Sequence, residues 1–236
     1  MRLKTSVVIP AYNEEQCIKN CLESLFNQQV LADEIILIDN NCTDKTVKIA
    51  SKYPIRIIKE TVQGMIPARN TGYNNARYDI LVKCDADAIV PPEWIKKIKY
   101  NYETFPIDAL TGLVYFYDVF SKSVFFYRLA LEIIKIMLRG KETLSGANCS
   151  LKNTVWKKVR NHLCTNEGAI HEDLDLAIHL HQLSKTIRRD NSLIVGTSAR
   201  RIKKKPYSTF IEYPIRSART ILQHSLSSFY SHARFG

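Results

Sequence analysis

Two carboxylates that could share one cation, Asp85 and Asp87, directly follow the apolar run 79–84 (DILVKC). Carboxylates two residues apart at the end of a strand can converge on a hard cation such as Mg²⁺ or Mn²⁺, and that cation can hold a diphosphate. A bare D-x-D also occurs by chance in solvated loops, so the pair by itself leaves both interpretations open. Its position directly after an apolar strand favours a metal site.

A second acidic group, Glu172 and Asp173, follows His171 at the start of a predicted helix. The helix dipole favours acidic residues in a first turn, so helix capping alone explains them. A carboxylate at this place could instead act as the general base for an incoming hydroxyl group. His179 and His181 raise a zinc alternative, but H-E-x-x-H is absent, which argues against metalloprotease-type chemistry.

Candidate phosphate-binding cations stand in two places. Arg69 lies on a predicted helix after the flexible segment 63–64, and an arginine near strand ends can clamp a phosphate. Arg200 and Arg201 follow the predicted strand 192–197 and could reach a diphosphate. A surface arginine and a solvated charged face explain the same residues, so neither place identifies a phosphate site by itself.

The elements that must position these residues alternate between strand and helix in the first half of the chain. Short apolar runs predict strands, and apolar residues at helical spacing predict helices. The predicted strands are 6–11, 34–39, 55–59 and 79–84, and the predicted helices are one that Asn13 caps, with Gln16 completing a capping box, and those at 43–52, 67–76 and 92–102. This alternation predicts an α/β fold, a three-layer α/β/α domain with a mostly parallel central sheet.

Sheets of this kind bind ligands at the carboxyl ends of their strands. Polar residues gather there after the first, second and fourth predicted strands, namely Tyr12, Asn13, Glu14, Asp39, Asn40, Asn41, Asp85 and Asp87. The topology therefore predicts one polar cluster at this edge of the sheet.

The pattern changes in the second half of the chain. We expect strands at 108–116 and 192–197, a short turn or strand at 146–151, and helices at 124–138 and 171–182. From residue 200 onward the chain is basic and amphipathic.

The overall charge points to an anionic partner. The 34 Lys and Arg residues against 23 Asp and Glu give a net charge of +11, which suits nucleic acid, an acidic membrane surface or a phosphorylated ligand. Residues 200–236 hold eight of these cations and a single acid, so most of the excess lies in this tail. With only 8 Gly and 8 Pro among 236 residues, collagen-like, low-complexity and largely disordered proteins are excluded.

The six cysteines show neither C-x-x-C nor paired zinc-finger spacing. Reduced, buried thiols in an intracellular protein explain them better than disulfides or a metal site. The N-terminus shows no signal-peptide pattern, and the chain lacks a stretch of about 18 uncharged apolar residues that would predict a simple spanning helix.

Six segments carry more information in their order than each does alone. They are V-V-I-P-A-Y-N-E-E near the N-terminus, E-I-I-L-I-D-N-N-C-T-D-K-T, G-M-I-P-A-R-N-T-G, D-A-D followed by P-P-E-W-I, G-A-N-C-S, and H-E-D-L-D-L. Together they closely resemble a family 2 glycosyltransferase with the A-type, nucleotide-sugar-binding fold, and the resemblance covers residues 5–200. It implies an enzyme that moves a sugar from a nucleotide-diphosphate sugar to an acceptor hydroxyl with inversion of the anomeric centre.

The resemblance assigns the donor to residues from both ends of this region. Those expected to contact the nucleotide, its phosphates or the sugar are Pro10, Ala11, Tyr12, Glu14, Asp39, Arg69, Asp85, Ser198, Arg200 and Arg201. Among them Asp39 is expected to contact the base, and residues 197–201 to lie over the diphosphate. The expected cofactor is Mn²⁺ or Mg²⁺, which Asp87 binds directly while Asp85 reaches the ribose or a metal-bound water.

The same resemblance implies the acceptor side of the site. Asp173 is expected to be the catalytic base, and Glu172 to hold an acceptor or sugar hydroxyl. Gly146, Ala147 and Asn148 are expected to border the donor sugar and the acceptor.

Two departures from the family pattern matter. The second strand usually ends in two acidic residues, whereas here Asn40 follows Asp39, which leaves the base unidentified. The Q-x-x-R-W segment and the multiple spanning helices of processive synthases are missing, which favours the addition of a single sugar.

Other functions stay open. A polyprenyl-phosphate sugar synthase would share these features. A sugar nucleotidyltransferase would want a glycine-rich, basic loop after the first strand, where this chain has A-Y-N-E-E. A nucleic-acid-binding protein should interleave basic and aromatic residues along one face, whereas these basic residues concentrate at the end of the chain, so nucleic acid is not the expected partner. The intact Asp85, Asp87 and Asp173 argue against a catalytically inactive relative.

We expect residues 1–105 to form the nucleotide-sugar-binding half of the domain, residues 106–199 the acceptor-binding and catalytic-base half, and residues 200–236 a basic amphipathic tail. The stretches 124–138 and 207–235 are amphipathic and could hold the enzyme on an anionic membrane, near a lipid-linked or cell-surface glycan acceptor. Ordinary core packing or a dimer contact explains each stretch as well. The expected location is cytoplasmic, peripheral at the inner face of the cell membrane, and the oligomeric state stays open.

Overall fold

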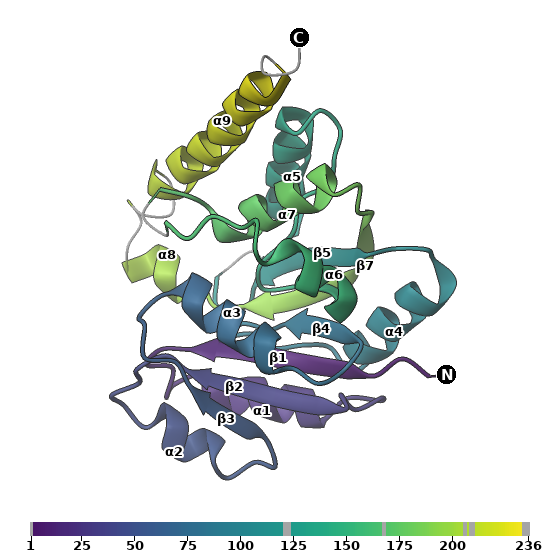
Figure 1. Ribbon diagram of the computed structural model, residues 1–236. Coiled ribbons are helices and arrows are strands. Elements are labelled where there is room, and N and C mark those ends of the chain that lie inside the picture. Colours follow the sequence, from purple (N-terminus) through teal and green to yellow (C-terminus); the bar gives the residue numbers. More distant parts are fainter. Residues whose placement is uncertain (1, 120–123, 167–168, 205–206, 208–210, 233–236) are drawn as a thin grey trace.

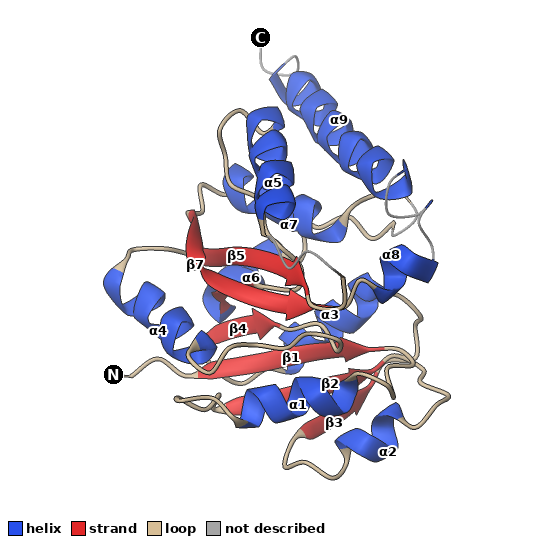
Figure 2. Ribbon diagram, turned by 180° about the vertical axis from the view of Figure 1, so that it is seen from behind, coloured by secondary structure: helices blue, strands red, loops and turns tan. Residues whose placement is uncertain are grey.

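A mixed sheet with strand order β3-β2-β1-β4-β6-β5-β7 runs through the centre of the molecule (Figures 1 and 2). The computed structural model describes residues 2–119, 124–166, 169–204, 207 and 211–232. The strands of this described part are β1 Thr5–Ala11, β2 Glu34–Asp39, β3 Arg56–Lys59, β4 Ile80–Lys83, β5 Ala109–Phe116, β6 Cys149–Lys152 and β7 Ile187–Thr197. Strands β1 to β4 pair in parallel, β6 is antiparallel to both of its neighbours, and β5 pairs in parallel with β7. The predicted α/β fold with a mostly parallel sheet is confirmed.

Helices cover both faces of the sheet. The helices of the described part are α1 Ile18–Phe26, α2 Thr46–Ala50, α3 Met65–Asn75, α4 Trp94–Thr104, α5 Phe125–Met137, α6 Asn153–Val159, α7 Glu172–Gln182, α8 Arg200–Lys204 and α9 Tyr213–His232. Val7 and Ile9 of β1 pack with α1 and α4, whereas Val8 packs with α3, α6 and α7 on the opposite face. Successive strand residues point to opposite faces, so a strand covered on both sides reads as a continuous apolar run.

The helix predicted to begin at Asn13 begins later, at Ile18, and the predicted capping box is wrong. Asn13 has a left-handed backbone with φ of 54°, and its Oδ1 accepts the N–H of Thr43 at 2.8 Å instead of capping the helix. This bond joins the loop after β1 to the loop after β2. The capping signal was misread because an asparagine side chain can bind any nearby backbone N–H, including one 30 residues away.

The prediction also missed the first part of β7, which begins at Ile187 rather than at residue 192. The missed stretch contains Arg188 and Arg189, which look like loop residues in the sequence. In the fold, the Arg188 guanidinium lies 3.6 Å from the centre of the Phe105 ring, and Arg189 pairs with Glu132 at 2.7 Å. These tertiary contacts allow charged residues within a strand.

The predicted tail contains α9, which packs on α7. The hydroxyl of the buried Thr220 accepts the N–H of His171 at 2.9 Å, and the rings of His171 and Tyr213 meet edge to face at 5.7 Å. Core packing, one of the alternatives for the tail, therefore accounts for this face of α9. Residues 233–236 lie outside the described part. None of the described helices is both long enough and apolar enough to cross a membrane.

Candidate active site

The carboxyl ends of β1 and β2 lie side by side, as the topology predicted. Ala11 and Asp39 are register partners, and the N–H of Asn40 donates to the carbonyl of Ala11 at 3.0 Å. Oδ1 of Asp39 accepts the N–H of Cys42 at 2.8 Å, which closes a tight turn after β2. Tyr12 is 51% exposed beside this turn. An aromatic ring and a carboxylate at adjacent strand ends could bind a base, and Pro10 and Ala11, which precede Tyr12, are buried.

Asn40 stands where the family pattern usually has a second acidic residue, and its side chain has a structural role. Its amide donates to the carbonyl of Val62 at 2.7 Å, and its Oδ1 accepts the N–H of Gly64 at 2.8 Å. A carboxylate could not donate to Val62, so only an amide satisfies both contacts. Asn40 thus braces the loop that leads into α3, where Arg69 stands.

The D-x-D loop follows β4 and is tied to the end of β7. Ile89 and Gly196 exchange two backbone hydrogen bonds of 2.8 and 3.0 Å. The carboxylate of Asp87 is nearly buried, and its Oδ1 accepts the hydroxyl of Thr197 at 3.0 Å. Two carboxylates on one short, anchored loop offer hard oxygen ligands, so Asp85 and Asp87 fit Mn²⁺ or Mg²⁺.

The segment after β7 returns to the same edge of the sheet. The Arg200 guanidinium pairs with the buried carboxylate of Glu14, and the Ser198 hydroxyl donates to Asp118 at 2.8 Å. The N–H of Ala199 also donates to Asp118, at 2.6 Å. Glu14 and Arg200, both expected at the nucleotide, therefore meet each other, 186 residues apart in the chain. The side chain of Arg201 lies outside the described part of the structure.

A buried lysine that the sequence analysis did not single out stands beside the expected catalytic base. Lys83 ends β4, and its Nζ lies 3.3 Å from Oδ1 of Asp173 and 3.8 Å from Oε1 of Glu172. The side chains of Lys83 and Asp173 are both almost fully buried. A lysine inside the apolar strand DILVKC was the available signal, because a buried lysine nearly always has an acidic partner.

The two carboxyl groups beside Lys83 are shifted in opposite directions. Burial raises the pKa of Asp173, the negative charge of Glu172 raises it further, and Lys83 only partly offsets this. Burial alone would raise the pKa of Glu172 too, but the charges of Lys83 and His171 outweigh it and lower that pKa. Pairs of carboxyl groups shifted apart in this way are typical of acid–base sites, where the group with the higher pKa moves the proton.

His171, Glu172 and Asp173 also present ligand atoms within 4.8 Å of one another. The ammonium group of Lys83 lies near the carboxylates of Glu172 and Asp173, so its positive charge already offsets their negative charge. A second cation at this place would be repelled, and this trio therefore fits proton transfer better than a metal site.

Gly146 leaves room for the ion pair. A Cβ at this position would lie 2.1 Å from Oδ2 of Asp173 and 2.9 Å from Nζ of Lys83. Ala147 is half-buried beside it, whereas Asn148 is fully buried. The Asn148 amide donates to two backbone carbonyls, at 2.9 and 2.8 Å, and accepts the indole N–H of Trp94 at 2.9 Å. The structure thus places Gly146 at the expected base and Asn148 within the sheet, where it joins β5 to β7.

Arg69 lies near α7. It is fully buried, its Nη1 donates to the carbonyl of Glu172 at 3.2 Å, and its guanidinium lies 5.8 Å from the centre of the Trp156 ring. These contacts hold the N-terminus of α7 against α3. The expected contact between Arg69 and a nucleotide stays a prediction.

A family model described as "Glycosyl transferase family 2" matches residues 6–161, which is more than half of the chain. Among curated proteins, "Dolichol-phosphate mannosyltransferase" of Pyrococcus furiosus is 35% identical over 102 residues, 41% of this chain and 29% of that protein. "Poly(ribitol-phosphate) beta-glucosyltransferase" of Bacillus spizizenii is 31% identical over 124 residues, 47% of this chain and 20% of that protein. The chain therefore spans less than a third of the length of these relatives.

Solved structures share the fold at low identity. The mannosyltransferase PcManGT from Pyrobaculum calidifontis, in complex with GDP-Man and Mn²⁺, has a TM-score of 0.70 at 21% identity, covering 100% of this chain and 66% of that one. S. aureus TarS in complex with UDP-GlcNAc has a TM-score of 0.68 at 20% identity, covering 83% of this chain and 58% of that one.

Proposed function

This chain belongs to glycosyl transferase family 2, and we propose that it is an inverting, metal-dependent enzyme that transfers one sugar from a nucleotide-diphosphate sugar to an acceptor hydroxyl. One observation carries the proposal. The end of β4 brings the D-x-D loop and the buried Lys83–Asp173 pair together, because Lys83 stands two residues before Asp85. A place for the diphosphate and a place for the general base therefore adjoin at one edge of the sheet.

The donor side is assigned to residues 1–105 and the segment 197–201. A Mn²⁺ or Mg²⁺ ion held by Asp87 and Asp85 would neutralise the leaving diphosphate. Arg200 can add to this neutralisation, since its guanidinium lies at the same edge, paired with Glu14.

The acceptor side is assigned to residues 106–199. Asp173 takes the proton from the acceptor hydroxyl as its oxygen forms a bond to the anomeric carbon. The bond from that carbon to the diphosphate oxygen breaks on the opposite face, and its electron pair leaves with the nucleoside diphosphate, which inverts the anomeric centre. Lys83 orients Asp173 and keeps a second partner in Glu172 once Asp173 is protonated. Glu172, ionised, can accept a hydrogen bond from an acceptor or sugar hydroxyl.

Thermal unfolding with a panel of nucleotide-diphosphate sugars and Mn²⁺ tests the donor class. A ligand at about 100 times its Kd adds about 2.7 kcal/mol to the stability of the folded state, which in a chain of this size raises Tm by roughly 5–10 °C. We expect this shift for one base, uridine or guanosine, and its loss when the metal is chelated. Uniform failure of the panel, with and without metal, would contradict the proposed function.

The acceptor class is tested with the matching donor. Transfer to a polyprenyl phosphate would identify the polyprenyl-phosphate sugar synthase alternative, whereas transfer to a glycan hydroxyl supports the main proposal. Two relatives motivate both arms, since one is named as a dolichol-phosphate mannosyltransferase and another as a poly(ribitol-phosphate) glucosyltransferase.

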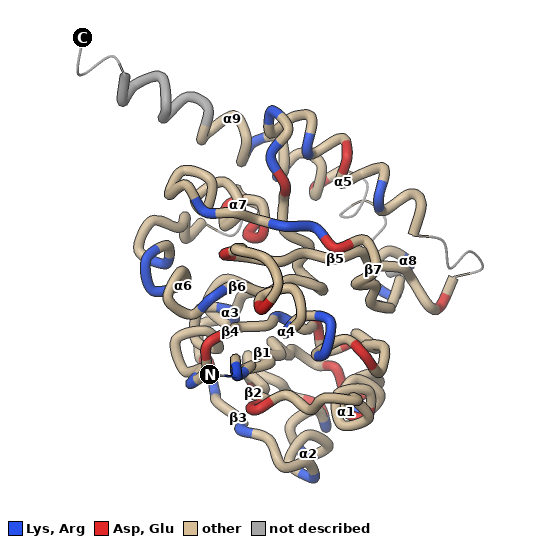
Figure 3. Tube along the Cα trace, turned by 90° about the vertical axis from the view of Figure 1, so that its right-hand side faces the viewer, with Lys and Arg blue, Asp and Glu red and all other residues tan. Residues whose placement is uncertain are grey.

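We further propose that the exposed face of α5 docks on an anionic membrane. Large apolar side chains repeat along this helix toward solvent, among them Phe126 at 72% exposed and Ile136 at 76% exposed; the set is Phe125, Phe126, Leu129, Ile133, Ile136 and Met137. Exposed Arg128, Arg139 and Lys141 accompany them, together with the acid Glu132, which pairs with Arg189; Figure 3 shows both blue and red along α5. An apolar helix face with basic neighbours is typical of binding at an anionic lipid interface.

Sedimentation with vesicles of neutral lipid, with and without phosphatidylserine, tests this surface. The double variant Phe126→Glu, Ile136→Glu is expected to lose most binding to anionic vesicles, because charged side chains cannot enter the acyl region. Tyr100→Glu, on the exposed face of α4, is the matched control and should bind as before. A different outcome would identify this face as a contact between two copies of the chain. In that case the wild-type chain would not sediment with vesicles, and light scattering would show a dimer that the double variant does not form.

A further inference from the structure

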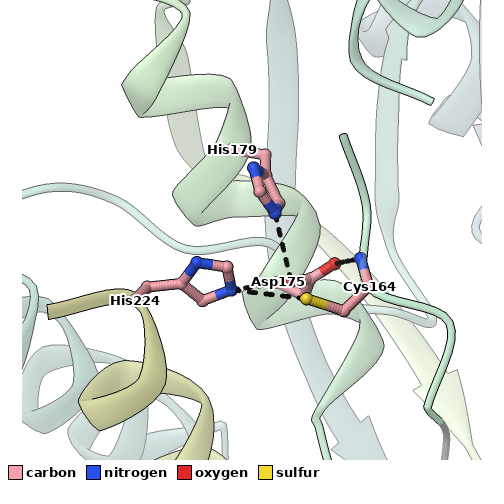
Figure 4. Close-up of side chains that lie close together, drawn as sticks. All are labelled: Cys164, Asp175, His179 and His224. Atoms are coloured by element: carbon pink, nitrogen blue, oxygen red, sulfur yellow. Dashed lines mark hydrogen bonds and ion pairs between the residues drawn. The ribbon is translucent and has the colours of Figure 1, made fainter. Parts of the chain in front are cut away.

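Four side chains from three segments converge at a place that the proposed reaction does not use (Figure 4). Cys164 precedes α7, Asp175 and His179 stand one turn apart on α7, and His224 comes from α9. Each offers one ligand atom, and these atoms all lie within 4.8 Å of one another. Nε2 of His224 lies 2.8 Å from Oδ1 of Asp175, and Nε2 of His179 lies 3.4 Å from the same oxygen. The Sγ of Cys164 lies 3.9 Å from Nε2 of His224.

Hydrogen bonds alone account poorly for this cluster. Both imidazoles direct Nε2 at one carboxylate oxygen, and within the described part of the chain the buried Nε2 of His179 has no hydrogen-bond partner. A buried polar atom without a partner costs stability. A Cys–His–Asp catalytic triad does not fit either, because such a triad uses both ring nitrogens of the histidine, whereas here the thiol and the carboxylate face the same nitrogen.

We propose that Cys164, Asp175, His179 and His224 bind a structural Zn²⁺ ion. Ligand atoms of a tetrahedral zinc lie about 3.3–3.6 Å apart, given metal–ligand distances of about 2.0–2.3 Å. Three of the six separations, at 2.8, 3.4 and 3.9 Å, lie on either side of this range, and all six are within 4.8 Å, so side-chain rotations could close the site. One thiolate and two imidazoles select zinc over Mn²⁺ or Mg²⁺, which prefer oxygen ligands.

The surroundings support a closed site with four protein ligands. The other oxygen of Asp175, Oδ2, accepts the N–H of Cys164 at 3.1 Å, which leaves Oδ1 directed at the two histidines. A backbone bond of this kind orients a ligating carboxylate. Zinc would take Cys164 as the thiolate, because a metal ion deprotonates a coordinating thiol.

The consequence is a link between the C-terminal helix and the catalytic helix. His224 would fasten α9 to α7 through the ion, and Asp175 stands two residues after Asp173. The zinc would thus hold the N-terminal turn of α7, the part that presents Asp173 and Glu172. The interpretation of the cysteines as reduced thiols without a metal role would then be wrong for Cys164. In the sequence, the spacing of Asp175 and His179, four residues apart on a predicted helix, was the pattern that indicated two ligands on one helix face.

Metal analysis of the full chain, purified without chelator, tests the site. We expect about one zinc per chain in the wild type and in Asp87→Asn, and a large loss in Cys164→Ser and in His224→Ala. Exposed His162, two residues from Cys164, provides the matched control, since His162→Ala should keep its zinc. Retention in Asp87→Asn separates this site from the metal of the proposed reaction, so either proposal can fail alone.

Cobalt substitution in the wild-type chain keeps the test valid if the variants do not fold. After the zinc is chelated and replaced by Co²⁺, a thiolate-to-cobalt charge-transfer band in the near ultraviolet is expected, together with recovery of the Tm lost on chelation. A folded wild-type chain that holds no zinc and gives no such band with Co²⁺ would overturn the proposal. Unchanged zinc content in both folded variants would overturn it as well.

Discussion

Replacing Asp173 by asparagine is expected to lower the transfer rate by about 10²–10⁴-fold, the usual contribution of a general base. The amide keeps the size of the carboxylate but cannot take a proton from the acceptor hydroxyl. The D-x-D loop stays intact, so the Kd of the donor should change little. The check is kcat with a saturating acceptor, measured beside the donor Kd by calorimetry.

Asp79→Asn is the matched control for this variant, because Asp79 is an exposed aspartate that directly precedes β4, whereas Lys83 ends that strand. It should retain the wild-type rate.

The pH profile adds an independent test. Asp173 must be ionised to accept a proton and its pKa is raised, so the wild-type rate should fall at a higher pH than an ordinary aspartate would give as the solution is acidified. Full turnover in Asp173→Asn, or an unchanged acid limb in its residual activity, would remove Asp173 from the role of base.

Replacing Asp87 by asparagine is expected to lower metal-dependent transfer by about 10²–10³-fold, since metal stabilisation of a leaving diphosphate supplies several kcal/mol. The substitution replaces a charged oxygen ligand by a weak neutral one. Asp87 is nearly buried, so little water is available to take its place. Unlike Asp173→Asn, this variant should also lose affinity for the donor. The check is a Mn²⁺ titration followed by electron paramagnetic resonance, with the donor Kd measured at the same metal concentration.

The variant Thr197→Val distinguishes the effect of the Asp87 carboxylate itself from the effect of the hydrogen bond that holds it in place. The Thr197 hydroxyl donates to Oδ1 of Asp87 at 3.0 Å, so its removal should weaken Mn²⁺ binding far less than Asp87→Asn does. Equal effects of the two variants would mean that Asp87 acts through the fold of the loop. Wild-type Mn²⁺ affinity in Asp87→Asn would place the cation elsewhere.

Much of the fold was predictable because short-range patterns report burial. The continuous apolar runs that became β1, β2 and β4 are typical of strands covered on both faces. Parallel pairing then directs the carboxyl ends of those strands to one edge, so the polar cluster around Asp39 and Asp87 followed without tertiary information. The local errors came from polar residues whose partners are distant, namely Asn13, which binds Thr43, and Arg189, which binds Glu132 and Glu142.

By itself, the sequence determined the family, the α/β sheet and the polar edge of that sheet at which we propose that a nucleotide sugar binds, since these depend on spacing along the chain. Tertiary structure decided which charges meet. It paired Lys83 with Asp173 across 90 residues and Glu14 with Arg200 across 186, and it brought His224 to Asp175. Hydrophobic periodicity records which face of an element is buried but not which element covers it. The partner of a buried charge is therefore set only when the helices pack on the sheet.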